Sequence, residues 1–215
     1  MRALTPLEAR VLGVLVEKQH TVPDTYPLSL NSLAAGCNQK TARAPVIEAS
    51  DAELLTALDG LKSLSLVFEG SSSRVLKFEH NAGRVLGVPS QSVALLAVLM
   101  LRGPQTSAEL RLNCERLHRF ADISSVEGFL EELATKEPAR LVKLARAPGE
   151  REARWAHLLC GEVVSTAVPG SEGAMGVSAG ELSALKAEQT RLAAEVEMLK
   201  ALVTRMAREL GIDTV

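Results

Sequence analysis

The stretch "LVFEGSSSRVLKFEH", residues 66–80, decides the fold of the first part of the chain. Apolar and polar residues alternate around a central "GSSS", and a period of two is typical of β-strands, whose side chains point alternately to opposite faces. Gly and Ser favour a turn, so the stretch predicts a β-hairpin. A two-stranded hairpin is at best marginally stable alone. The residues before it must therefore supply a surface on which it packs.

Three helices are predicted between the N-terminus and this hairpin. The first begins with the pattern T-P-x-E, in which Thr5 caps the helix and Glu8 closes a capping box. The second carries leucines at helical spacing and ends near Gly36. The third begins at Ser50 with another capping box and buries a row of leucines. Three helices followed by a hairpin are the plan of a winged-helix domain, which we predict for residues 1–85.

The same order of elements recurs downstream with different letters. A helix is predicted for each of the stretches "SQSVALLAVLMLRG", "QTSAELRLNCERL" and "DISSVEGFLEELATKE". The second of these helices has a capping box of Thr106 and Glu109. Two strands flanking "APGE" follow within "ARLVKLARAPGEREARWAHLLCG". We therefore predict a mainly α protein with small β-hairpins, of the α+β class, in which a second winged-helix domain covers residues 86–162.

The last part of the chain carries a different pattern. Residues 163–180 are rich in glycine and lack periodicity, which predicts a flexible linker. Residues 181–211 show the heptad spacing of a coiled-coil helix. A lone helix of this kind is marginal in water, so we expect a homodimer. We expect the two helices to be parallel, because Glu181 of one would then face Lys186 of the other. The alternative is that the seam folds back onto the chain's own domains. The dimerisation seam consists of Leu182, Leu185, Leu192, Val196, Leu199, Val203, Met206 and Leu210.

Composition and charge exclude several classes of protein. The 215 residues include 24 Lys and Arg and 26 Asp and Glu, so no overall field draws the chain to nucleic acid or to an acidic membrane. The three cysteines, Cys37, Cys114 and Cys160, are odd in number and widely spaced, which favours buried, reduced thiols. The longest apolar run, residues 93–101, is too short to span a bilayer, and the N-terminus lacks a signal peptide's apolar stretch. We expect a cytoplasmic protein that does not enter a membrane.

The sequence carries no recognisable catalytic motif. The spelling "GVSAG" at residues 176–180 matches a nucleophile elbow, but no strand precedes it, and Ser178 is instead predicted to cap the following helix. The four histidines are too scattered to suggest a metal site: His20, His80, His118 and His157. We therefore expect a binding or regulatory protein that is not an enzyme and that has no cofactor.

Nucleic acid is the leading ligand hypothesis, with DNA bound through loops and hairpins. The third helix of each predicted domain exposes mainly Asp and Glu, which argues against simple insertion into the major groove. The polar run from Asn38 to Arg43 exceeds what a connection needs, and we interpret it as a binding surface. An adaptor that binds another protein through its acidic third helices and apolar grooves is the alternative. The candidate DNA contacts are Lys40, Arg43, Arg74, Lys77, Lys143, Arg146, Arg151 and Arg154.

Three stretches together resemble a known bacterial family over about residues 4–162: "LTPLEARVLGVLVEKQHTVPDTYPLSLNSLAAGCNQKTARAPV", "LMLRGPQTSAELR" and "RLVKLARAPGEREARWAHL". They are similar to the YceH-like family of uncharacterised proteins. The resemblance implies a tandem winged-helix fold and brings no known enzyme activity or cofactor. The family commonly has an acid before the proline of the basic loop, where this chain has Ala44, so no role of that acid is expected here. The heptad segment lies outside the resemblance.

Overall fold

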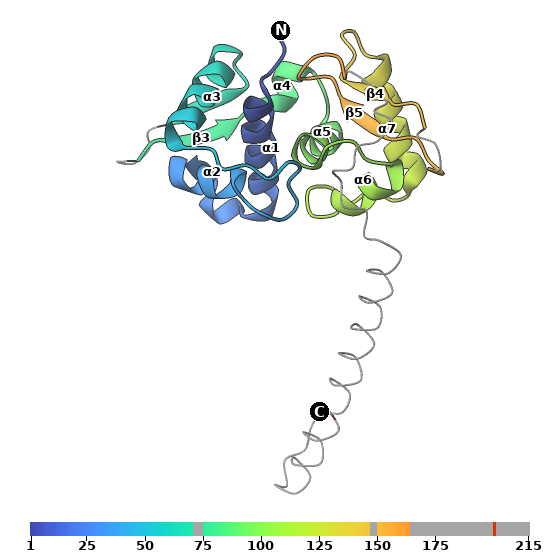
Figure 1. Cartoon of the computed structure of the whole chain (residues 1–215), viewed down its shortest axis with the longest axis horizontal. Helices are drawn as coiled ribbons and strands as arrows, with labels where there is room; N and C mark the ends of the chain where they lie inside the picture. The colour runs from blue at the N-terminus through green and yellow to red at the C-terminus, as the bar shows by residue number, and fades with distance from the viewer. Residues whose placement is uncertain (71–74, 147–149, 164–199, 201–215) are drawn as a thin grey trace, which may run out of the picture. The chain divides into compact units, whose positions relative to one another are not determined.

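The computed structural model describes residues 1–70, 75–146 and 150–163, together with Lys200. Residues 1–165 form one compact unit and residues 166–215 a second, and all described elements but Lys200 belong to the first (Figure 1). The predicted linker and coiled coil, including Ser178 and the dimerisation seam, therefore lie outside the described residues except at their single positions Val163 and Lys200.

The first half of the compact unit, residues 4–86, contains the predicted helices and hairpin. Strands β2 and β3 pair antiparallel, with Phe68 opposite Glu79, which confirms the hairpin. Strand β1 adds to β3, so the sheet order is β1-β3-β2; a two-residue strand has no period from which it could be predicted. The elements are α1 (Pro6–Thr21), the 3-10 turn η1 (Pro23–Thr25), β1 (Leu28–Ser29), α2 (Leu30–Cys37), α3 (Asp51–Ser63), β2 (Val67–Gly70), β3 (Lys77–His80) and α4 (Ala82–Leu86).

The second half, residues 90–163, repeats this order. Its elements are α5 (Ser90–Arg102), α6 (Ser107–Asn113), α7 (Ile123–Thr135), β4 (Leu141–Lys143) and β5 (Trp155–His157). Strands β4 and β5 pair antiparallel, as predicted. Gln105 forms a single antiparallel bridge to Trp155, just as Leu28 pairs with Phe78 in the first half. The residue after each bridging position, Ser29 or Thr106, caps the next helix. The α+β class is thus present, with matching connectivity in both halves.

Local capping explains where several helices begin. The three predicted capping boxes are present: in each, the N-cap hydroxyl accepts the N–H of a Glu three residues on, whose carboxylate accepts the N-cap N–H. The pairs are Thr5 with Glu8, Ser50 with Glu53, and Thr106 with Glu109. Each cap satisfies otherwise unpaired backbone donors, worth about 1 kcal/mol.

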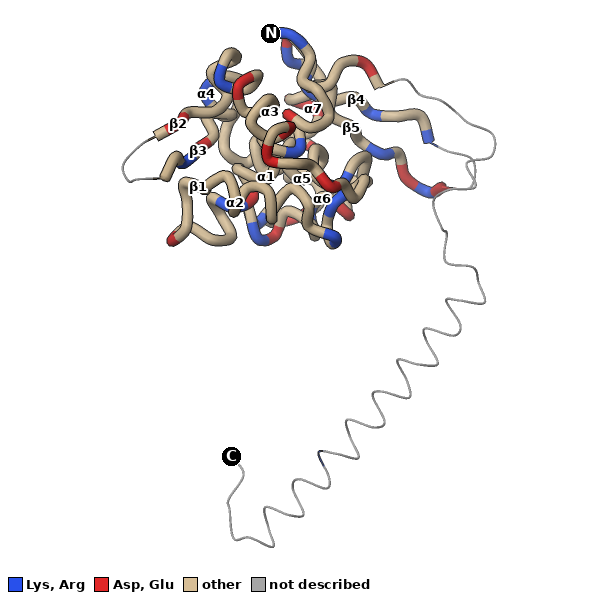
Figure 2. Tube along the Cα trace, turned by 60° about the vertical axis from the view of Figure 1, so that its left-hand side comes forward, with Lys and Arg blue, Asp and Glu red and all other residues tan. Residues whose placement is uncertain are grey.

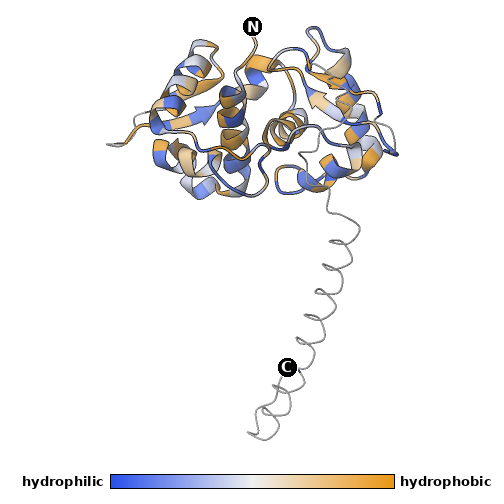
Figure 3. Cartoon of the chain, viewed as in Figure 1, coloured by the Kyte–Doolittle hydropathy of each residue, from blue (hydrophilic) through white to orange (hydrophobic). Residues whose placement is uncertain are grey.

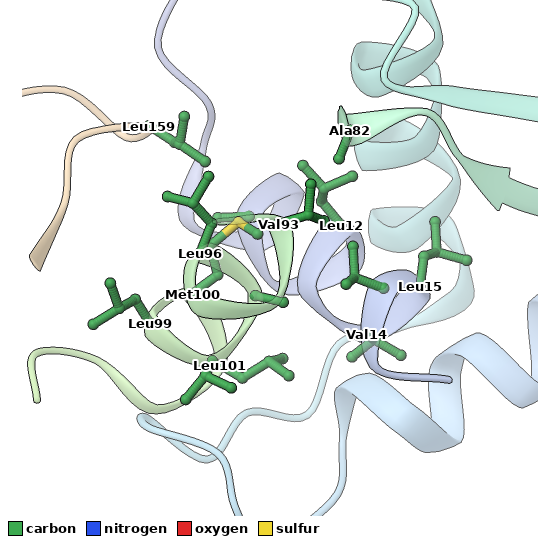
Figure 4. Close-up of a cluster of buried hydrophobic side chains, with 14 of the residues drawn as sticks. Leu12, Val14, Leu15, Ala82, Val93, Leu96, Leu99, Met100, Leu101 and Leu159 are labelled. Atoms are coloured by element: carbon green, nitrogen blue, oxygen red, sulfur yellow. The ribbon is translucent and has the colours of Figure 1, made fainter. Parts of the chain in front are cut away.

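The two halves share one hydrophobic core, which extends from Leu4 to Leu159. Helices α1 and α5 pack side by side at its centre, and Figure 4 shows leucines of both helices meeting there. The Cβ that a side chain would add at Gly13 of α1 would lie 3.0 Å from the side chain of Leu101, so glycine permits this close approach. The predicted domain boundary after residue 85 falls within α4, inside the shared unit.

Helix α5 accounts for the long apolar run in the sequence. Every residue from Ser92 to Leu101 is buried, so the helix is enclosed on all sides and lies at the centre of the unit (Figure 3). Helices that are apolar all round are core helices or membrane spans. In the described part of the chain, no helix combines the length and hydrophobicity that crossing a membrane requires.

Candidate binding surfaces

The loop between α2 and α3, residues 38–50, is held by side chains of its own and of α1. The Asn38 side chain donates to the carbonyl of Ala49 (2.9 Å) and accepts the N–H of the same residue (2.8 Å). Arg43 donates from Nε to the carbonyl of Gly36 (3.0 Å) and from both terminal nitrogens to the Glu17 carboxylate (3.1 and 2.6 Å). These bonds fix the path of the loop.

Arg43 is therefore a structural residue, and its placement among the DNA contacts is corrected. Its side chain has 0% exposure, so the guanidinium does not reach a phosphate. Burial alone would raise the pKa of Glu17, but the hydrogen bond and charge of Arg43, with help from Lys18, hold this pKa below its ordinary value. In the same loop, Lys40 is exposed, as a ligand contact would require.

The hairpin cations differ in whether they already contact other side chains of the protein. Lys143 lies over the Trp155 ring, with Nζ 5.2 Å from the centroid. Arg154 donates to Glu109 (2.8 Å) and to Glu150 (3.3 Å), so its charge is largely compensated. The remaining candidates are the exposed Arg146 and Arg151, the half-buried Lys77, and Arg74, which lies outside the described residues.

The candidate cations come from three separate segments of the chain. They lie on the α2–α3 loop, on the hairpin of the first sheet and on that of the second, and acidic residues separate them. Figure 2 shows basic and acidic positions interspersed along the tube. Of the described members of the predicted set, only Arg43 is withdrawn, because its side chain is buried.

A basic segment that was not predicted as a contact connects α6 and α7. Arg116 and Arg119 are exposed, and Arg111 donates to the carbonyl of Ala121 (3.1 Å). The signal in the sequence was the density of arginine in "RLNCERLHR", residues 111–119. Glu115, also exposed, lies within the segment and reduces its net charge.

An open hollow of about 800 Å³ lies between the start of α2, α3 and β3, and we call it the α2–α3–β3 hollow. Its apolar lining combines residues from all three elements. Leu55 of α3 is 42% exposed, and Leu76, next to β3, is 50% exposed. Exposed apolar side chains are unremarkable singly, but their convergence in a hollow marks an interaction site. Its lining includes Asp24, Leu30, Leu55, Leu76, Lys77 and Phe78.

The charges beside the hollow are mainly acidic. Asp51 and Asp59 are exposed on α3, and the lining itself carries Asp24 and Lys77. Lys62 of α3 is bound to Asp59 (2.8 Å) and to Glu69 of β2 (2.7 Å). These pairs neutralise the one lysine that the third helix carries. An approaching phosphate would therefore meet carboxylates along α3.

Burial limits the chemistry of several cysteines and histidines among the described residues. Burial raises the pKa of Cys37 and of Cys114 to about 12, so both thiols stay protonated and inert near neutral pH. Cys160 is only half-buried, unlike the predicted spectator, and all three are free thiols. Burial lowers the pKa of His80 and of His157 to about 4. Among the described residues, no group of three His, Cys, Asp or Glu side chains is placed to hold a metal ion.

Comparison with known proteins assigns the chain to a family. Residues 4–150 match the family described as "Protein of unknown function, DUF480". The chain belongs to the DUF480 family. This membership agrees with the resemblance to the YceH-like family seen in the sequence.

Relatives of high identity bear the name UPF0502 protein. One from Burkholderia multivorans is 71% identical over 215 residues, covering 99% of this chain and 92% of the relative. Others from Paraburkholderia xenovorans and Paraburkholderia phytofirmans are each 70% identical, covering 99% of this chain and 91% and 92% of the relatives. The DUF480 match ends at residue 150, whereas the matches to these relatives cover 99% of this chain and so extend into residues 151–215.

Proposed function

We propose that this DUF480 chain is a non-enzymatic adaptor that binds a partner protein in the α2–α3–β3 hollow. Each half is, in this proposal, a winged-helix module. The repeated order of helix, bridging strand, two helices and hairpin supports that assignment. In such a module the third helix and the hairpin present the ligand-binding side. The hollow lies on that side of the first module, beside α3 and β3.

The apolar lining of the hollow carries this proposal. A DNA-binding groove exposes Lys and Arg toward phosphates and polar side chains toward bases. Here Leu55 and Leu76 stand half-exposed, and α3 carries exposed Asp51 and Asp59. Covering the half-exposed leucines would contribute on the order of 1 kcal/mol each. Contact with phosphate would meet repulsion from the carboxylates.

The partner that fits is an amphipathic helix with a row of large apolar residues and Lys or Arg beside it. Its apolar row would cover Leu55 and Leu76, as helices bound in grooves do. Its cations would face Asp24 and Asp51, because Asp59 is already paired with Lys62. Charge complementarity of this kind adds mainly specificity and association rate.

Photo-cross-linking in the cell tests the proposal. A benzophenone amino acid replaces Leu76, and in a matched control it replaces Leu112, which is 68% exposed on α6 in the second half. We expect a protein adduct from position 76 alone. With the purified partner, Leu55→Asp should weaken binding at least ten-fold, and Leu112→Asp should not. Adducts with nucleic acid, or with residues 166–215 of the chain itself, would contradict the proposal.

DNA contact through the second half is a second candidate. The exposed Arg116 and Arg119, together with Arg146 and Arg151, favour it. Retention on unrelated duplex DNA at about 50 mM salt, where phosphate contacts are strong, tests this candidate. Retention that falls when Arg116 and Arg119 are both changed to Ala would support it, and absence of retention would remove it.

The proposal also includes pairing of two chains through residues 181–211. The heptad spacing of leucine and valine supports it. Two copies would present two hollows to a multivalent partner and so raise the apparent affinity. Analytical ultracentrifugation of the full chain should show a dimer, which Leu192→Asp with Leu199→Asp should convert to a monomer. A monomeric wild-type chain at micromolar concentration would refute the pairing.

A further inference from the structure

A second cavity, of about 320 Å³, lies at the junction of the two halves, and we call it the junction pocket. It is built from segments far apart in the sequence: α1, the α2–α3 loop, α5 and β5 with the residues after it. Its lining is mostly apolar and includes Ala9, Pro45, Leu99, Met100 and Ala156. Ligand pockets in proteins have volumes of about 300–1,000 Å³, so this one suits a small molecule.

Arg10 places a buried positive charge in the wall of this pocket. The residue is 3% exposed, and its two terminal nitrogens donate to the carbonyls of Cys37 (3.0 Å) and Pro45 (2.6 Å). Its Nε is buried and has no hydrogen-bond partner within the described part of the chain. No ion pair joins Arg10 to a carboxylate of the described residues either.

An uncompensated buried guanidinium is costly, because carbonyl dipoles alone do not neutralise its charge. Burial and then the like charge of Arg43 lower the pKa of Arg10. An arginine nevertheless stays protonated at neutral pH, since its ordinary pKa exceeds 12. The buried charge of Arg10 therefore favours an anionic ligand at this site.

His157 of β5 also lines the junction pocket and carries a second unpaired polar atom. Its Nδ1 is buried without a hydrogen-bond partner among the residues that the structure describes. Burial lowers the pKa of His157 to about 4, so the ring is neutral at neutral pH. A neutral imidazole carries one N–H, which an anion's oxygen accepts when the tautomer places it on the nitrogen that faces the pocket.

We propose that the junction pocket binds a small carboxylate with an apolar body. The carboxylate accepts hydrogen bonds from Arg10 and His157, and the apolar body packs against Leu99, Met100 and Ala156. Glu162 also lines the pocket and is exposed, so it disfavours a second negative charge toward the solvent. The ligand is therefore a monoanion with an apolar chain or ring. This inference is independent of the partner proposed for the α2–α3–β3 hollow.

Calorimetric titration of the full-length protein with octanoate and with phenylacetate tests this site, and octanamide is the neutral control of matched shape. We expect at least one carboxylate to bind, with octanamide at least ten-fold weaker than octanoate if octanoate is the one that fits. The bound carboxylate should also raise the Tm, because a ligand that binds only the folded state stabilises it. No binding by either carboxylate, or equal binding of octanoate and octanamide, would overturn the proposal.

Two variants locate the site. Ala44→Trp fills the pocket from an exposed lining position and keeps the backbone hydrogen bond from Ala44 to the Leu101 carbonyl (2.8 Å). It should abolish binding, whereas Ala35→Trp, at an exposed position of α2 outside the pocket, should not. If circular dichroism shows that Ala44→Trp is misfolded, His157→Phe is the deciding variant. It should weaken carboxylate binding at least ten-fold.

Binding that survives the deciding variant would overturn the assignment. Leu55→Asp, in the α2–α3–β3 hollow, should leave carboxylate binding unchanged. Failure of this proposal is thereby distinguishable from failure of the proposed partner binding.

Discussion

Both terminal nitrogens of the Arg43 guanidinium donate hydrogen bonds to the carboxylate of Glu17, at 3.1 and 2.6 Å. This pair ties the α2–α3 loop to helix α1, and the arginine side chain is fully buried. A buried pair of this kind is expensive to break, because removal of one partner leaves the other charge without compensation.

We predict that Arg43→Ala destabilises the protein by about 3 kcal/mol, since it strands the Glu17 carboxylate and frees the Gly36 carbonyl. Urea unfolding followed by circular dichroism measures the change. Lys40→Ala, at an exposed position of the same loop, is the control and should change stability by less than about 0.5 kcal/mol. Equal effects of the two substitutions would show that the Arg43 contacts are not structural.

The same pair predicts a pH dependence of stability. Arg43 and Lys18 hold the pKa of Glu17 below its ordinary value despite burial, so the folded state favours the carboxylate. The stabilisation is complete above the unfolded-state pKa of about 4.3 and is lost as pH falls through the lower folded-state value. The free energy of unfolding of Glu17→Gln should therefore lie below that of wild type at pH 7, and the gap should narrow below about pH 4. A gap that is constant from pH 7 to pH 3 would contradict this origin.

Sequence patterns predicted helices α1–α3 and α5–α7 and both hairpins, because burial on one face imposes a period that the letters display, but they did not predict the five-residue α4. The three capping boxes were equally readable, since they depend on residues three positions apart. Strand β1 was not predicted, because two residues carry no period. The shared core between α1 and α5 depends on packing between distant segments, and the sequence favoured two separate cores instead.

Charged residues were the least predictable feature of the candidate sites. Arg43 was interpreted as a DNA contact because it lies in a polar, basic loop, and its half-buried partner Glu17 lies 26 residues away. Arg10 lies within an apolar helix and was not predicted as a site residue, yet it is buried and lines the junction pocket. Both cavities combine residues from several elements, so spacing along the chain carries no signal for them.

Two glycines in helices allow a matched test of helix packing. A Cβ on Gly36 of α2 would lie 2.6 Å from Cγ1 of the buried Val14, so Gly36→Ala must push α2 away from α1. We predict a loss of about 1–3 kcal/mol, typical of overpacking. Gly128→Ala in α7, where no atom lies within 4 Å of the added Cβ among the described residues, should stabilise by about 0.5–1 kcal/mol. Thermal unfolding compares them, and the same sign for both would contradict the described packing.

The shared core predicts that both halves unfold together. Leu96→Ala on α5 removes a fully packed side chain at the junction and should cost about 2–5 kcal/mol. Hydrogen exchange should report the same decrease in the free energy of opening for slowly exchanging amides of α1 and of α7, because a single unfolding transition exposes both. Loss confined to the second half would show that residues 1–85 form an independent domain, as the sequence alone suggested.

Hydrogen–deuterium exchange on the full chain with its purified cross-linked partner tests the central claim, that the α2–α3–β3 hollow is the docking surface, most directly. We predict slower exchange on partner binding in α2, α3 and β3, with the segment of residues 111–119 unchanged. Protection confined to residues 111–119, or produced instead by duplex DNA, would contradict the claim.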